Sequence, residues 1–186
     1  MTRIIAGTAG GRRIATPPGD ATRPTTDRVR EALFSSLESQ LGGWDDVRFL
    51  DLFAGSGANG LEALSRGAVH ATFVEADRKA AALISRNAES LGLGAAAEVV
   101  AASASTAVER LSAAYHAVLL DPPYDYADES LGTLLGALES RGVLAEDAIV
   151  VVERGRRSNE PQWPDHVEAT RSKKYGSTVL WYGHRA

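Results

Sequence analysis

From position 47 onward, short apolar segments alternate with amphipathic ones, and this alternation constrains the fold more than any other feature of the chain. Short apolar runs favour buried strands, whereas apolar residues spaced three and four apart favour helices. A β-α repeat of this kind predicts an α/β fold with a doubly wound, mostly parallel sheet. The predicted strands are Val47–Phe53, Ala71–Val74, Ala97–Val100, Ala117–Leu120 and Ile149–Val152, and the predicted helices cover 58–66, 77–91, 105–113 and 129–141.

The two ends of the chain depart from this repeat. Segments 167–171 and 178–182, around a Lys173-Lys174-Tyr175-Gly176 turn, predict an antiparallel C-terminal hairpin that brings the sheet to seven strands. Near the start, residues 3–6 and 12–15 can pair as a small β-hairpin, and residues 25–27 can cap a helix that runs to about Leu41. We therefore expect an N-terminal extension over residues 1–24 and a main domain over residues 25–186.

The composition excludes several classes of protein. The hydrophobic content of 44% is ordinary for a globular domain, and no apolar run reaches the length of a membrane span. The first residues lack a secretory pattern. The absence of cysteine excludes disulfides and thiolate metal sites, and four scattered histidines do not suggest a metal centre. We expect a cytoplasmic monomer with no metal and no membrane partner.

Charge is distributed unevenly along the chain. Residues 1–30 and residues 154–186 each carry a net charge of +4, whereas residues 31–153 carry −12. Because attraction to phosphate is local and screened by salt, a bound polyanion should contact the two basic ends. The alternative is that these cations only solvate exposed termini. The candidate nucleic-acid contacts are Arg3, Arg12, Arg13, Arg23, Lys173 and Lys174.

A glycine-rich turn follows the first predicted strand of the repeat. Gly55, Gly57 and Gly60 satisfy the dinucleotide-binding pattern G-x-G-x-x-G, which is a weak signal on its own. Asp51 lies four positions before Gly55, inside the strand. A carboxylate there would repel a pyrophosphate but would attract a cationic ligand. The loop therefore favours a ligand that carries an ammonium or similar group.

Two further acids are predicted at the same edge of the sheet. Glu75 ends the next strand, where a carboxylate can accept hydrogen bonds from both ribose hydroxyls. The alternative is that Glu75 only helps Asp77 to cap the following helix. Together with Asp51 and Asp121, Glu75 would place three acids on one edge, which suits a ligand that brings positive charge. S-adenosylmethionine is such a ligand, through its sulfonium and amino groups.

The third acid belongs to the segment Asp121-Pro122-Pro123-Tyr124, just past the predicted strand 117–120. In open α/β sheets, ligands bind at this carboxyl edge. The prolines donate no hydrogen bonds and hold the chain extended, so we expect both of their carbonyls to be free to accept. A carboxylate, bare carbonyls and a flat ring suit a planar group with an NH2, such as a nucleobase amine. The alternative is an ordinary surface turn with a packed tyrosine.

These features, taken together, resemble a known family. The residues 51–57 and 121–124 are similar to those of class I S-adenosylmethionine-dependent methyltransferases that act on exocyclic amines. More narrowly, the chain resembles the bacterial RsmD family of small-subunit (16S) rRNA guanine-N2 methyltransferases over nearly its whole length. The more specific blocks are Arg3-Ile4-Ile5-Ala6-Gly7 with Gly10-Gly11-Arg12, the segment 23–34, and Lys174-Tyr175-Gly176.

The resemblance implies a Rossmann-like methyltransferase fold, S-adenosylmethionine as cofactor, and 16S rRNA, in the small subunit or its assembly intermediate, as partner. It implies that Ser103 stands where such enzymes often carry an Asp or Asn against the adenine. The implied cofactor residues are Thr25, Arg28, Asp51, Phe53, Ala54, Gly55, Ser56, Gly57, Glu75, Ala76 and Ser103, and the implied catalytic residues are Asp121, Pro122, Pro123 and Tyr124.

Three other functions remain open at this stage. A DNA adenine-N6 methyltransferase needs the same amine geometry, but the chain has no room for a separate target-recognition domain. A non-catalytic RNA-binding protein with a relic cofactor fold would not need Asp51, Glu75 and Asp121 intact. A nicotinamide-dependent dehydrogenase is disfavoured by Asp51 and by the lack of an evident hydride-transfer residue.

Overall fold

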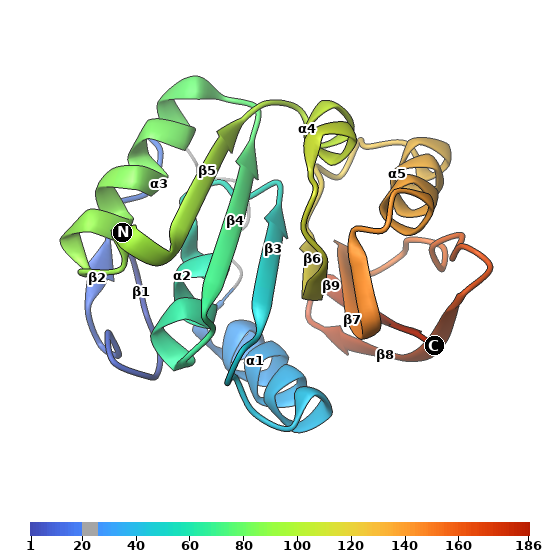
Figure 1. The fold of residues 1–186 in the computed structure, drawn as a ribbon, viewed down its shortest axis with the longest axis horizontal. Helices are drawn as coiled ribbons and strands as arrows, with labels where there is room; N and C mark the ends of the chain where they lie inside the picture. The colour runs from blue at the N-terminus through green and yellow to red at the C-terminus, as the bar shows by residue number, and fades with distance from the viewer. Residues whose placement is uncertain (20–25) are drawn as a thin grey trace.

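The computed structural model, described for residues 1–19 and 26–186, confirms the predicted α/β class (Figure 1). Seven strands form one sheet in the order β5-β4-β3-β6-β7-β9-β8. The pairs β5-β4, β4-β3, β3-β6 and β6-β7 are parallel, whereas β9 runs antiparallel to both β7 and β8. The strands are β3 Arg48–Leu52, β4 His70–Glu75, β5 Ala97–Ala101, β6 Tyr115–Leu120, β7 Leu144–Gly155, β8 Val167–Tyr175 and β9 Thr178–Arg185.

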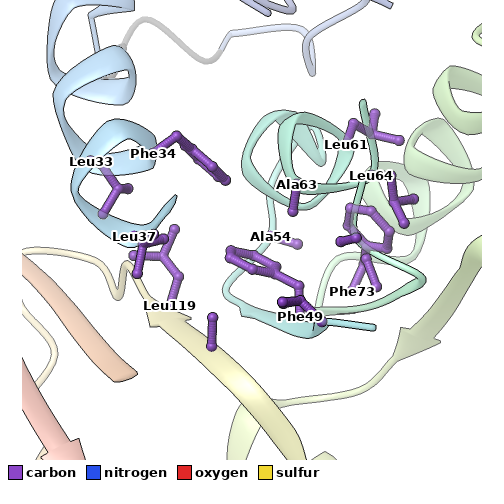
Figure 2. Close-up of a cluster of buried hydrophobic side chains, with 14 of the residues drawn as sticks. Leu33, Phe34, Leu37, Phe49, Ala54, Leu61, Ala63, Leu64, Phe73 and Leu119 are labelled. Atoms are coloured by element: carbon purple, nitrogen blue, oxygen red, sulfur yellow. The ribbon is translucent and has the colours of Figure 1, made fainter. Parts of the chain in front are cut away.

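Helices cover both faces of the sheet, as expected for a doubly wound fold. Helices α1–α3 pack with the N-terminal residues in one buried cluster, part of which Figure 2 shows. Helices α4 and α5 pack in a second cluster on the opposite face. The bounds are α1 Asp27–Leu41, α2 Ala58–Arg66, α3 Arg78–Ser90, α4 Ala104–Arg110 and α5 Asp128–Ser140, with a 3₁₀ turn, η1, at Gly94–Ala96.

The first helix begins and ends as its sequence predicts. The Thr26 side chain accepts a hydrogen bond from the Val29 N–H, which satisfies one of the free donors of the first turn. The helix stops where Gly42 adopts the left-handed conformation at φ 75°, which favours glycine.

One predicted turn is displaced in the structure. Lys173 and Lys174 were expected in the turn of the C-terminal hairpin, but they lie in β8, paired with Leu180 and Val179 of β9. The ladder continues to Tyr175 and Thr178, so only Gly176 and Ser177 remain as the loop. A two-residue connection of this kind is the commonest hairpin loop, and Gly176 supplies its positive φ of 53°.

The N-terminal residues form the predicted hairpin and join the core of the main domain. Strand β1 (Thr2–Arg3) pairs antiparallel with β2 (Arg13–Ile14). The side chains of Ile4, Ala9 and Ile14 are buried in the same cluster as α1–α3. The expected boundary at residue 24 lies outside the described residues.

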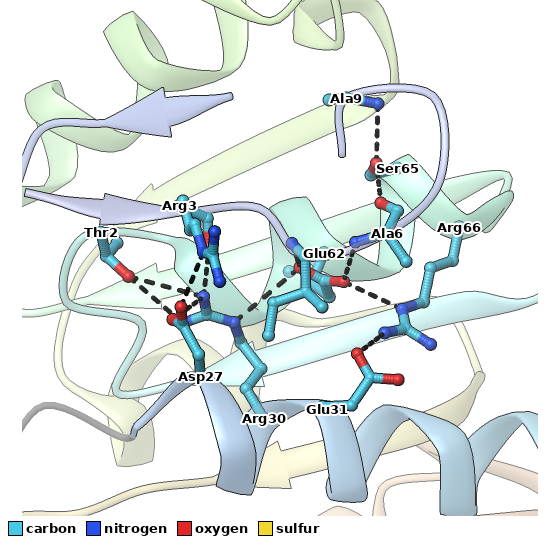
Figure 3. Close-up of polar contacts among 12 residues, drawn as sticks. Thr2, Arg3, Ala6, Ala9, Asp27, Arg30, Glu31, Glu62, Ser65 and Arg66 are labelled. Atoms are coloured by element: carbon cyan, nitrogen blue, oxygen red, sulfur yellow. Dashed lines mark hydrogen bonds and ion pairs between the residues drawn. The ribbon is translucent and has the colours of Figure 1, made fainter. Parts of the chain in front are cut away.

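A buried ionic network ties this extension to α1 and α2 (Figure 3). Glu62 of α2 is fully buried and accepts hydrogen bonds from the backbone N–H groups of Ile5 (2.8 Å) and Ala6 (3.1 Å). The same carboxylate accepts from Arg66 Nε at 2.9 Å and lies 3.8 Å from Arg30 Nε. Burial lowers the pKa of the Arg30 guanidinium, opposed by the charges of Glu62 and Asp27. Glu62 therefore neutralises two cations and satisfies two backbone donors at once.

We predict that Glu62→Gln destabilises the fold by about 3–5 kcal/mol, because removing one partner leaves buried charges uncompensated. The matched control is Glu38→Gln: Glu38 also pairs with Arg66, at 3.8 Å, but it is 53% exposed. An exposed pair of this kind contributes at most about 1 kcal/mol. Urea unfolding followed by circular dichroism measures both variants. Equal losses in the two variants would show that burial of Glu62 does not matter.

Candidate functional site

A cavity of about 670 Å³ opens at the carboxyl ends of β3, β4, β5 and β6. The strand order reverses between β3 and β6, and open α/β sheets bind ligands at such a reversal. The volume falls within the range of small-molecule sites. The lining residues are Phe53, Gly55, Val74, Glu75, Ala76, Ala102, Ser103, Ala104, Ser105, Asp121, Pro122, Pro123, Tyr124 and Tyr126.

Asp51 lies in β3 beneath the glycine loop and is only 1% exposed. Its Oδ2 accepts a hydrogen bond from the Gly60 N–H at 3.0 Å, whereas its buried Oδ1 has no partner among the residues that the structure describes. Burial raises the pKa of the Asp51 carboxyl to about 7; the Gly60 hydrogen bond opposes the rise, and the charges of Asp121 and Glu75 add to it. A buried carboxylate oxygen without a donor is costly unless a ligand supplies one.

The glycine loop brings α2 close to the sheet. A Cβ on Gly60 would lie 2.2 Å from the Phe73 ring, so only glycine fits between α2 and β4 at this point. This close approach puts the Gly60 N–H on the Asp51 carboxylate. Gly57, at the N-cap of α2, has φ 84° and a Cβ position 2.9 Å from Ile84, so it too requires glycine. The loop thus depends on Gly57 and Gly60 for its shape.

The residue before the loop is conformationally strained. Phe53 has φ 63°, a left-handed conformation that bulky side chains rarely adopt. Its ring lines the cavity and contacts Tyr126 edge-on, with centroids 5.2 Å apart. Strain of this kind costs about 1–3 kcal/mol and is concentrated at functional sites.

Glu75 connects the end of β4 to the glycine loop. Its Oε1 accepts from the Gly55 N–H at 3.0 Å, and its Oε2 accepts from the Asp77 N–H at 2.7 Å. Asp77 caps α3 by accepting from the Ala80 N–H, as predicted. Glu75 therefore holds the loop in this structure while it faces the cavity.

Ser103 lines the cavity and is also the N-cap of α4. Its hydroxyl accepts from the Thr106 N–H at 3.3 Å and bonds to Thr106 Oγ1 at 2.9 Å. A capping role was not foreseen for this residue. The lining residues that sequence reasoning missed are Val74, Ala102, Ala104, Ser105 and Tyr126, which are small or apolar and carry no motif.

The Asp121–Tyr124 segment follows β6 and forms one wall of the cavity. Pro122 is buried, whereas the Tyr124 side chain is 55% exposed at the rim. The expectation that both proline carbonyls are free is wrong for Pro123. Its carbonyl accepts from the Tyr126 N–H at 3.0 Å and from Arg154 Nη1 at 3.2 Å. The Pro122 carbonyl is then the proline acceptor to consider for a ligand.

Arg154, at the end of β7, is a site residue that sequence reasoning missed. It is 6% exposed and donates to the carbonyl of Tyr126 at 2.6 Å as well as to that of Pro123. Its Nη2 also contacts Asp128 Oδ1 at 3.1 Å. Arg154 therefore fixes the Asp121–Tyr124 segment from the neighbouring strand. The available signal was an arginine two positions past the predicted apolar strand 149–152.

Several predicted site residues do not line the cavity. Asp51 lies beneath the glycine loop, Ala54 and Gly57 are buried, the Ser56 carbonyl accepts from Asn87, and Arg28 is exposed on the first turn of α1. Thr25 and Arg23 lie outside the described residues.

The predicted nucleic-acid contacts differ in how free they are. Arg3 pairs with Asp27 at 2.7 Å, and Arg12 donates to the carbonyl of Ser90. Arg13, Lys173 and Lys174 are exposed.

Two absences concern the described residues alone. Within residues 1–19 and 26–186, no group of three or more histidine, aspartate or glutamate side chains is arranged to hold a metal ion. Across those same ranges, no helix is long and apolar enough to cross a membrane.

Known proteins resemble this chain in sequence and in fold. The chain is 38% identical over 177 residues to ribosomal RNA small subunit methyltransferase D of Escherichia coli K12, covering 95% of this chain and 86% of that protein. The solved structure of the Escherichia coli protein yhhF matches with a TM-score of 0.87 at 37% identity, over 99% of this chain and 97% of that one. An RNA methyltransferase from Salinibacter ruber, solved in complex with S-adenosyl-L-homocysteine, shares the fold with a TM-score of 0.65 at 17% identity, over 88% of this chain and 94% of that one.

Residues 2–184 also match the family described as conserved hypothetical protein 95. The match spans the N-terminal extension, the glycine loop, the Asp121–Tyr124 segment and the C-terminal hairpin alike. The chain therefore belongs to the conserved hypothetical protein 95 family, the RsmD family.

Proposed function

We propose that this protein transfers a methyl group from S-adenosylmethionine to the exocyclic N2 amine of a guanine in 16S rRNA of the small ribosomal subunit. The proposal rests on two features that lie at one sheet edge. The first is Asp51 Oδ1, which has no hydrogen-bond partner among the described residues, and the second is the Asp121–Tyr124 wall of the cavity. The first suits the cationic cofactor, and the second suits a planar amine. Family membership supports rRNA as the substrate.

The residues at the cofactor end fit S-adenosylmethionine. Asp51 Oδ1 lacks a hydrogen-bond donor among the described residues, and the ammonium of the cofactor would supply one. The charges of Asp121 and Glu75 raise the cost of ionising Asp51, which a bound cation would offset. Glu75 would accept from the ribose hydroxyls and Ala76 would lie beside them, while Ser103 and its neighbours would border the adenine. When bound, the cofactor supplies an electrophilic methyl group.

The residues at the substrate end would activate a weak nucleophile. The lone pair of a nucleobase amine is delocalised into the ring, so the nitrogen attacks poorly unless it is oriented. Asp121 and the Pro122 carbonyl would accept its two N–H groups, aim the lone pair at the methyl carbon and stabilise the positive charge that develops on the nitrogen. The nitrogen would gain the methyl group, with the electron pair of the broken bond left on the cofactor, and would then lose a proton.

The target base would have to leave its helix to reach this wall. Exposed Tyr124 would stack on the base, a contact typically worth about 1–3 kcal/mol. Recognition of this kind requires an unpaired or flipped nucleotide. We further propose that residues 1–24 contact RNA, with Arg13 as the exposed cation of β2.

We predict that Asp121→Asn lowers kcat for methyl transfer by about 10²–10³-fold, because the variant keeps an oxygen acceptor but loses the negative charge that stabilises the developing positive charge. Cofactor affinity should change little, since Asp121 lies on the substrate wall. Radiolabelled transfer and calorimetric titration measure the two quantities. Asp125→Asn, in the same exposed loop, is the matched control and should keep kcat. Near-normal turnover by Asp121→Asn would refute the assigned role.

We predict that affinity for S-adenosylmethionine falls about tenfold for each pH unit below 7, because a cation binds only the ionised Asp51 and its pKa is raised to about 7. Above pH 7 the carboxyl is ionised and its contribution to affinity stays constant. Calorimetry between pH 5.5 and about 8.5 measures this dependence. Asp51→Asn keeps the shape without the titrating group, so its affinity should be weak at every pH. The same pH slope in that variant would assign the dependence to another group.

We predict that Arg154→Lys lowers kcat by about tenfold to a hundredfold while cofactor affinity changes little. Lysine keeps the charge but lacks the planar fork that reaches both the Pro123 and Tyr126 carbonyls. A displacement of about 1 Å in a catalytic wall is enough for a loss of this size. Arg141→Lys is the control. Arg141 is exposed, and among the described residues its side chain donates to the Glu109 carbonyl near the end of α4, away from the Asp121–Tyr124 segment. An unchanged kcat in Arg154→Lys would show that catalysis does not need the contacts of Arg154 with the Pro123 and Tyr126 carbonyls.

The proposed function itself is tested by offering labelled cofactor with three acceptors in parallel. These are small subunits that lack the modification, unmodified 16S rRNA, and DNA. We expect transfer to RNA, in one or both forms, and a methylated guanine after digestion. Transfer to DNA alone would favour the adenine-N6 alternative, and no transfer with intact cofactor binding would favour a non-catalytic protein.

A further inference from the structure

Three strand ends meet beside Tyr124 at the edge that carries the cavity. Gly155, the last residue of β7, pairs with Thr178 of β9, and Thr178 pairs with Tyr175 at the end of β8. A Cβ on Gly155 would lie 3.0 Å from Tyr124 Cε1 and 3.2 Å from Cδ1. The Tyr124 ring therefore lies directly against the end of β7, and whatever follows these strands borders the ring.

Exposed cations occupy that border. Arg156 and Arg157 follow β7 directly, and both are exposed. Arg156 is fixed to the β8–β9 loop, because its N–H donates to the Ser177 carbonyl at 2.8 Å and its Nη1 donates to the Gly176 carbonyl at 3.2 Å. A guanidinium has five N–H donors, so these contacts place the Arg156 head group and leave donors for a further acceptor.

The strand register assigns the two lysines of β8 to opposite faces. Val179 pairs with both Arg154 and Lys174, so Lys174 shares the face on which Arg154 reaches the Asp121–Tyr124 segment. Leu180 pairs with both Glu153 and Lys173, so Lys173 lies on the other face, toward α1. Gly155 alternates with Arg154 along β7 and so shares the face of Glu153 and Lys173, and its Cβ position meets the Tyr124 ring. Of the two lysines predicted to contact RNA, Lys173 is therefore the one on the face of the Tyr124 ring.

The nearby acids do not cancel this positive charge. Asp128 is paired with Arg154 at 3.1 Å and accepts from Asn159 at 3.3 Å. Asp125 is exposed on the same loop as Tyr124, and Glu160 is exposed three positions after Arg157, so two exposed acids stand against three cations. Glu75 and Asp121 line the cavity itself, and Asp51 is buried beneath the glycine loop, so a phosphate in the cavity would be repelled. A polyanion at this edge would thus be held at the rim and excluded from the cofactor end.

We infer that Arg156, Arg157 and Lys173 form a phosphate-binding rim that grips the RNA backbone next to the base stacked on Tyr124. The inference rests on the proposed function and deepens it, because it names the surface that fixes the register of the target nucleotide. Backbone contacts of this kind set position, while the base itself is read by the cavity wall.

The test uses Arg156→Gln, Arg157→Gln and Lys173→Gln, singly and combined, in the full chain. Binding of unmodified 16S rRNA and of small subunits lacking the modification is measured from about 0.05 to 0.3 M monovalent salt. Each lost phosphate contact should reduce the slope of log K against log salt by about 0.7 and weaken binding about fourfold near 0.15 M salt. The RNA KM should rise in parallel, whereas kcat and cofactor affinity should stay unchanged.

Lys174→Gln is the matched control, since it removes the same charge one residue away on the opposite face. We expect less than about twofold weakening in this variant. Equal losses in Lys173→Gln and Lys174→Gln, or an unchanged salt slope in the combined variant, would overturn the rim. So would a defect on assembled subunits alone with no change of slope, which would indicate a protein contact. If the wild-type chain methylates no RNA, the proposed function fails, and the binding slope still decides the rim.

Discussion

The hydrogen bond between the buried Asp51 carboxylate and the Gly60 N–H is the interaction on which the rest of the site depends. One oxygen of this carboxylate holds the Gly60 N–H and so fixes where α2 begins against the sheet. That bond is possible only because Gly60 has no side chain to meet the Phe73 ring. A second carboxylate, Glu75, holds the Gly55 N–H on the other side of the loop. The glycine loop is therefore held by hydrogen bonds to two carboxylates, and both carboxylates are also proposed to contact the cofactor.

This arrangement separates two kinds of charge along the sheet edge. Asp51, Glu75 and Asp121 lie at the ends of three neighbouring strands, and their mutual repulsion contributes to the raised pKa of Asp51. The cations lie one strand farther, where Arg154 holds the substrate wall and Arg156 borders Tyr124. A cationic cofactor and an anionic polymer would each meet the opposite charge. The same separation would keep each ligand out of the other's site. The cationic cofactor would be repelled by the arginines, and the RNA phosphates would be repelled by the three acids.

Much of this site could be predicted because it follows from strand periodicity. The carboxyl ends of parallel strands meet at one edge, so Asp51, Glu75 and Asp121 converge once the strands are assigned. Arg154 could not be predicted in the same way, since its role depends on the path of a loop that follows a different strand. Phe53 shows a related limit: its positive φ is imposed by the turn and has no signature in a phenylalanine. The lysines of β8 were misplaced because the hairpin ladder continues past them to Tyr175.

Glu62 shows why charge counted along the sequence differs from charge on the surface. The first 30 residues contain six arginines, which suggests a strongly basic extension. Yet Arg30 is buried beside Glu62, Arg3 is paired with Asp27, and Arg12 is bound to a backbone carbonyl of α3. Much of that positive charge therefore holds the extension on the main domain and is not free for a polyanion. By contrast, the exposed cations after β7 keep donors available, so residues 154–186 present more usable positive charge than residues 1–30, although both segments carry a net charge of +4.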